Sequence, residues 1–145
     1  MTEESISPLE AFHNLFYYFA EELEILTWDA AKLWCWAKYP YIAGEIQWEM
    51  RGYMECLLQN LCGLLTESEC AAIQVFLNAI ERLPDEAIRG GEEALHHPGW
   101  EEIRRGARDL LERLARPMAE NKAFFEQEAQ KMQSESDESG AGVAP

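Results

Sequence analysis

Basic residues are scarce in this chain relative to acidic ones. The 145 residues include 27 Asp and Glu but only 12 Lys and Arg, which leaves a net charge of −15 at pH 7. Because contacts from Lys and Arg to phosphates supply most of the affinity of nucleic-acid-binding proteins, this balance argues against a nucleic-acid ligand. Five arginines do gather in one segment with acids between them, and we interpret this segment as a salt-bridged helix face. They are Arg104, Arg105, Arg108, Arg113 and Arg116.

Valine is rare in the chain, and long apolar runs are absent. Valine occurs only at Val75 and Val143, and no alternating β-branched run of strand length is present, which argues against a β-sheet. No stretch reaches 18 apolar residues without a charge, so no membrane span is expected. Residues 1–8 are acidic and lack the basic and apolar regions of a secretory signal. We therefore expect a cytoplasmic protein.

Motifs for catalysis or cofactor binding are absent. The sequence contains no G-x-S-x-G, no G-x-x-x-x-G-K and no G-x-G-x-x-G. Its three histidines do not have the H-E-x-x-H spacing, and its four cysteines form no C-x-x-C pair. We expect a protein that is not an enzyme and holds no cofactor or metal. The thiols are interpreted as reduced and packed in the core: Cys35, Cys56, Cys62 and Cys70.

Helix signals run through the rest of the chain. Ser7, Pro8 and Glu10 resemble a capping box with a first-turn proline, so a helix is predicted from Pro8 to about residue 26. A second capping box at residues 66–69 predicts a helix over residues 67–82. Apolar residues at steps of three and four predict further helices over 28–38, 41–64 and 100–114, a short one after Asp85, and a last one over 118–132.

These elements predict an all-α fold, a compact bundle of five to seven amphipathic helices. At this length folding buries about 68–70% of the surface of the unfolded chain, which is enough for a core without a metal or a disulfide. Residues 134–145 are small, polar and acidic. We therefore predict one helical domain over residues 1–133, followed by a disordered acidic tail over residues 134–145.

Aromatic and acidic residues concentrate in the first part of the chain. Twelve of the 16 aromatic residues precede residue 54, and seven acids but no Lys or Arg precede Lys32. Exposed aromatic side chains among carboxylates are typical of an interface with a basic partner. On the first helix, four such residues share an arc of about 60° that faces away from the apolar stripe. We predict that this arc binds a protein partner, unless a later helix covers its two aromatics: Tyr17, Glu21, Glu24 and Trp28.

In size, acidity, helical pattern and lack of catalytic motifs, the chain is similar to bacterial immunity proteins and antitoxins. The resemblance is one of type, and no motif carries it. It implies an inhibitor that neutralises a cognate toxin or effector by stoichiometric contact, with fast, salt-sensitive association. Two alternatives stay open: a secretion or folding chaperone for a specific client, and a phage-encoded inhibitor that mimics the charge of nucleic acid. A chaperone would bind through apolar surface with weak salt dependence, whereas a charge mimic would lose affinity steeply as salt rises.

Overall fold

The computed structural model describes residues 6–141, and this part of the chain is helical with no strand. The all-α prediction is confirmed. The described residues form eight helices rather than the predicted five to seven, because two four-residue helices flank Gly90 and Gly91. In chain order they are α1 (Pro8–Ile25), α2 (Ala30–Ala37), α3 (Ile42–Gln59), α4 (Glu67–Glu81), α5 (Asp85–Ile88), α6 (Glu92–Leu95), α7 (Gly99–Arg113) and α8 (Ala115–Ala141).

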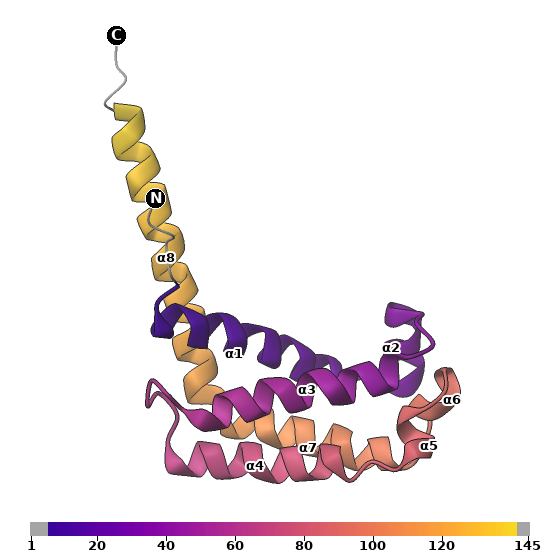
Figure 1. Ribbon diagram of the computed structural model, residues 1–145. Coiled ribbons are helices and arrows are strands. Elements are labelled where there is room, and N and C mark those ends of the chain that lie inside the picture. Colours follow the sequence, from indigo (N-terminus) through magenta and orange to yellow (C-terminus); the bar gives the residue numbers. More distant parts are fainter. Residues whose placement is uncertain (1–5, 142–145) are drawn as a thin grey trace.

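Four of the longer helices form the body of the molecule. Helix α1 packs against α3, α3 against α4, α4 against α7, and α7 returns to α1, so the four surround one core (Figure 1). The short helices α2, α5 and α6 gather at one end of this bundle. Each long helix contributes apolar side chains at helical spacing to the core. The largest fully buried ones include Phe16, Phe19, Met50, Met54, Ile73, Ile80, Ile103 and Leu110.

The starts of α1, α2 and α4 follow from side-chain caps that the sequence predicts. The backbone N–H of Glu10 donates to Ser7 Oγ at 3.2 Å, and Pro8 opens α1. Asp29 caps α2 by accepting from the backbone N–H of Lys32 at 2.8 Å. Each cap satisfies a backbone donor that has no partner inside its helix. The chain therefore bends after α1 instead of continuing straight into α2.

The arginines of α7 do more than form surface ion pairs. Arg104 is buried; it pairs with Glu101, and it donates from Nε to the carbonyl of Trp28 at 2.9 Å and from Nη2 to the carbonyl of Leu95 at 3.2 Å. Arg108 donates to the carbonyl of Thr27 at 3.2 Å. Thr27 and Trp28 follow the end of α1 and Leu95 is the last residue of α6, so these carbonyls lie where backbone acceptors lack partners. The sequence pattern had suggested only a salt-bridged face, whereas the structure uses these side chains to hold α7 against the turn after α1.

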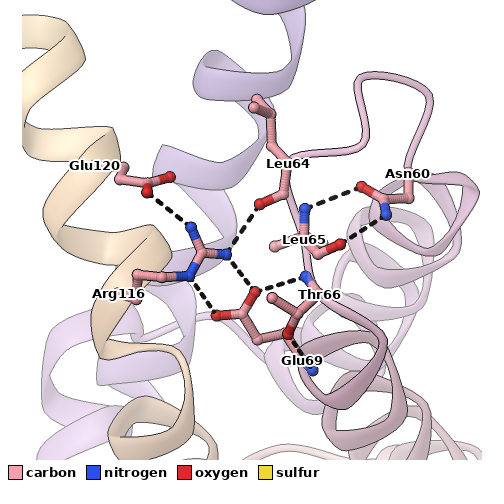
Figure 2. A network of polar contacts seen from close by, with 7 residues as sticks. All are labelled: Asn60, Leu64, Leu65, Thr66, Glu69, Arg116 and Glu120. Atoms are coloured by element: carbon pink, nitrogen blue, oxygen red, sulfur yellow. Dashed lines mark hydrogen bonds and ion pairs between the residues drawn. The ribbon is translucent and has the colours of Figure 1, made fainter.

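A polar network fixes the start of α8 to the start of α4 (Figure 2). Thr66 and Glu69 form the predicted capping box of α4, with distances of 2.8 Å and 3.1 Å. Arg116 donates from Nε to Glu69 Oε2 at 3.1 Å, pairs through Nη2 with Oε1, and also donates to the carbonyl of Leu64 at 3.0 Å. Its Nη1 donates to Glu120 Oε1 at 2.7 Å. One arginine thus connects the loop before α4, the α4 cap and the first turns of α8.

Only the first part of α8 packs on the bundle. Asn121 is buried and donates to Nδ1 of His13 at 3.0 Å and to its carbonyl at 2.9 Å, while Phe124 stacks on the imidazole with ring centroids 4.2 Å apart. Beyond these contacts the helix extends away from the body (Figure 1). No helix in the described residues is both long and apolar enough to cross a membrane.

The last helix runs further than the sequence indicates. It continues to Ala141, beyond the end predicted for it at residue 132, while the domain boundary at residue 133 and the disordered tail over residues 134–145 stay predictions. Once its first turns are anchored, a helix extends by adding one hydrogen bond per residue without a new nucleus, and residues 134–141 contain no proline to stop it. Residues 142–145, the remainder of the predicted tail, lie outside the described residues.

Candidate protein-binding surface

The predicted arc on α1 begins with Tyr17, Glu21 and Glu24, which are all exposed. The hydroxyl of Tyr17 donates to Glu21 Oε1 at 3.0 Å, and this bond, followed by the charge of Glu21, raises the pKa of the tyrosine. The ring of Tyr17 also meets Phe125 of α8 edge-on, with centroids 5.6 Å apart. A later helix therefore contacts this aromatic, although 43% of its surface stays exposed.

Trp28, the last residue of the arc, is half-buried at the turn after α1. Its indole packs edge-on against Trp36 of α2 with centroids 6.0 Å apart, and Lys32 Nζ lies 4.3 Å from the ring centroid. Its carbonyl accepts the Arg104 hydrogen bond described above. The acids in the middle of the arc are therefore exposed, whereas the aromatic residues at its two ends are partly covered by α8 and α2. The acids are better placed than the aromatics to contact a partner.

A second surface, on α3, combines larger exposed aromatics with acids. Trp48 is 74% exposed and Tyr41 is 68% exposed, and neither is part of the core. Tyr41, Glu45, Trp48 and Gly52 follow at steps of three and four, so they lie on one side of the helix, away from the buried stripe that contains Met50 and Met54. The apolar spacing of this helix predicted only its buried stripe. The complementary spacing of the exposed residues was the signal that could have identified the second surface.

Three open hollows follow one another along α3. The first lies between Tyr39, Tyr41 and Trp48, beside Ile88 of α5, and has a volume of about 560 Å³. The second shares Trp48 with the first, includes Gly52 and Tyr53, and has a volume of about 510 Å³. The third shares Leu15 and Cys56 with the second and reaches Leu61, which is 86% exposed. Since neighbouring hollows share lining residues, we treat them as one feature, called the α3 groove.

Carboxyl groups meet beside this groove, between α1 and α3. Glu22 is half-buried and its Oε2 is shielded from solvent without a hydrogen-bond donor from another described residue. Burial, then a hydrogen bond with Glu49, then the charges of Glu49 and Glu45 raise the pKa of Glu22 to about 9. Burial and the charges of Glu22 and Glu49 also raise the pKa of Tyr53. Glu22 is therefore protonated at neutral pH, and its own proton bonds it to Glu49.

The structure places the four thiols differently from the sequence interpretation. All four cysteines are free, but the expectation of core thiols is wrong for Cys35 and Cys56, which are exposed. Cys62 and Cys70 are half-buried, and Cys70 packs against the core. Cys56 lies beside the buried stripe of α3 rather than on it. Burial, together with the charge of Glu69, raises the pKa of Cys70, which makes it a poor nucleophile. Within residues 6–141 no three His, Cys, Asp or Glu side chains form a group that could hold a metal ion.

A further hollow of about 350 Å³ lies between α4 and α7, on the other side of the bundle. Its lining includes Ala71, Ala72, Ala79 and Gly106, and its one aromatic residue, Phe76, is buried. Small side chains offer little contact area to a partner, whereas large aromatics carry much of the binding energy at interfaces. The α3 groove is therefore the stronger candidate for a binding surface.

No protein-family model, curated protein or solved structure matches this chain. Its function is therefore inferred from the surfaces described above.

Proposed function

We propose that the protein is a stoichiometric inhibitor of the immunity or antitoxin type, which binds and neutralises a toxin or effector that carries a basic surface. The observation that supports this proposal is the exposure of Trp48 and Tyr41 next to carboxylates, on a chain with a net charge of −15. Exposed aromatics provide contact area, and surrounding acids attract a basic partner.

The acids and the aromatics have separate roles in this proposal. The exposed acids of α1, Glu21 and Glu24, act over distance and raise the rate of encounter with a positively charged surface. Trp48 and Tyr41 act after encounter, when water leaves their rings, and so slow dissociation. Trp28 and Tyr17 add to the contact only through the surfaces that α2 and α8 leave uncovered.

A neutralisation experiment tests the proposed function. When a protein that co-purifies with the chain is expressed alone, growth of the expressing cells should stop. When it is expressed together with the chain, growth should resume. In surface plasmon resonance with that protein, Glu21→Lys combined with Glu24→Lys should lower the association rate about 10-fold and flatten its salt dependence. The matched control makes the same charge change on α7, Glu102→Lys combined with Glu112→Lys. It should lower the association rate less than the α1 pair does. Equal rates for both pairs would contradict steering by α1.

A chaperone is the second candidate, because the α3 groove offers open apolar hollows to a client segment. Salt separates the two functions. Affinity for a toxin should fall steeply between low and physiological salt, since steering charges are screened over a Debye length of about 8 Å. Affinity for an apolar client should change little, and co-expression should raise the amount of soluble client rather than restore growth.

A further inference from the structure

We infer that the α3 groove is a docking site for a basic amphipathic helix of the partner protein. This inference rests on the proposed function and specifies which part of the partner is recognised. It follows from three features of the described residues: the spacing of the hollows, the sign of the charges beside them, and the lack of any strand edge.

The spacing of the hollows fits a helix that lies along α3. The 18 residues of α3 span about 27 Å at 1.5 Å per residue. From Trp48, shared by the first two hollows, to Cys56, shared by the last two, is about two helical turns. Apolar side chains at positions i, i+7 and i+14 of a docked helix recur at roughly 10.5 Å, close to the distance of about 12 Å along α3 from Trp48 to Cys56. Each hollow would therefore receive one apolar side chain.

The charges beside the groove favour a basic occupant. Glu45, Glu49 and Glu55 line it, while Arg51 lies 4.0 Å from Glu55 and 3.6 Å from Glu81 and is largely neutralised by them. Arg89 is the other cation of the lining and sits by the first hollow, so we expect a basic residue of the docked helix to face Glu49. The same balance disfavours a second copy of this chain, because each copy carries a net charge of −15.

The protonated pair of Glu22 and Glu49 supplies a separate readout. A Lys or Arg of the docked helix near Glu49 would also lie near Glu22, favour the ionised form of Glu22 and release its proton. An apolar segment alone would release none. A strand is disfavoured as the occupant because residues 6–141 contain no strand whose edge it could extend.

The probe is a synthetic peptide of Leu and Lys, about 18 residues long, with its leucines at helical spacing that includes positions i, i+7 and i+14. A peptide of the same composition with alternating Leu and Lys is the control for charge. Calorimetry at low salt, in two buffers of different ionisation enthalpy, measures affinity and proton release. We expect the helical peptide to bind at least about 10-fold more tightly than the alternating one and to release protons at pH 8.

Gly52→Leu is the decisive variant, because a Cβ added at Gly52 meets no atom within 4 Å and the new side chain fills the second hollow. It replaces glycine in an exposed helix and should raise stability, so weaker binding cannot be attributed to unfolding. We expect it and Trp48→Ala to weaken peptide binding at least about 10-fold. Gln74→Leu, which adds the same side chain to the exposed face of α4, should leave binding unchanged.

Equal binding of the peptide to all variants, equal binding of the two peptides, or no binding of either would overturn the inference. The proposed function has a different test, so the two can fail separately. If Gly52→Leu still neutralises the toxin at full strength, the inference is wrong and the inhibitor function stands. If the groove binds the helical peptide but no co-purifying protein is toxic, the inhibitor function is wrong and the groove has another partner.

Discussion

Two glutamates of this protein, Glu69 on α4 and Glu22 on α1, are shielded from water but have opposite surroundings. Burial alone would raise the pKa of Glu69, but hydrogen bonds from Arg116 and Thr66 outweigh it, and the net pKa is lowered. Glu22 meets a second carboxyl, Glu49, and its pKa is raised to about 9. The first environment stabilises the charged form, and the second keeps a proton in place of a cation.

The aromatic residues differ between the same two regions. Trp100 of α7 is 3% exposed and its Nε1 donates to the carbonyl of Ala87 at 2.8 Å, whereas Trp48 of α3 is 74% exposed. The charge of Glu69 and the indole of Trp100 are thus satisfied within the chain, whereas the indole of Trp48 faces solvent and Glu22 lies against a second carboxyl. A carboxyl with a perturbed pKa beside an exposed aromatic side chain is typical of a functional surface.

Arg116→Ala should cause a large loss of stability, because it leaves the carboxylate of Glu69 buried without its cation. We expect the free energy of unfolding to fall by about 3 kcal/mol in urea titrations at pH 7. Arg113→Ala is the matched control, since its pair with Asp109 is exposed on both sides and contributes about 0.5 kcal/mol or less. The stabilisation by Glu69 is present above pH 4.5 and should disappear as pH falls through its lowered pKa. If Arg116→Ala and Arg113→Ala lower the free energy of unfolding equally, the buried carboxylate of Glu69 does not depend on its cation, and the contrast with Glu22 is lost.

Glu22→Gln should stabilise the protein, by about 1–2 kcal/mol at pH 8. The folded state holds a proton on Glu22 that the unfolded state releases above pH 4.5, so the free energy of unfolding falls as pH rises from 4.5 towards 9. The amide stays neutral and removes this loss. Urea titrations at pH 5 and pH 8 should show the gain only at the higher pH. Glu24→Gln, on the exposed face of α1, should show no gain at either pH.

His13 should contribute a smaller pH dependence at the contact between α1 and α8. Burial lowers its pKa, partly opposed by the charge of Glu120, and its Nδ1 accepts from Asn121, which an imidazolium could not do. Stability from the neutral imidazole is full above pH 6.5 and declines as pH falls below it. His13→Gln should flatten this decline in urea titrations between pH 7 and pH 5, whereas exposed His96→Gln should preserve it.

Trp48→Ala should have the smallest effect on stability, within about 0.5 kcal/mol, because most of the side chain already faces water. Trp100→Ala provides the contrast and should cost about 3–5 kcal/mol through its buried volume and its lost hydrogen bond. Thermal unfolding of both variants checks the comparison. A large loss for Trp48→Ala would mean that this residue supports the fold, and it would no longer serve as a specific test of binding.

The sequence predicted the helices better than it predicted the candidate site. Caps at Ser7, Asp29 and Thr66 act through neighbours three residues away, so the helix starts could be found from local pattern alone. The arc of Tyr17 and Trp28 was also derived from local geometry, but what covers its ends comes from α8 and α2. Periodicity shows which face of a helix is polar and cannot show which distant helix lies against it.

The sequence by itself determined the helical class, the caps and the strong negative charge, because these depend on composition and on residues within one or two turns of each other. Only the tertiary structure decided that Arg116 reaches Glu69, that Glu22 meets Glu49, and that three hollows join along α3. Each of these features depends on how two or more helices pack. The capping bonds of Thr66 act on Glu69 locally, but the groups that a second helix brings against a carboxyl decide whether it gains a cation or keeps a proton.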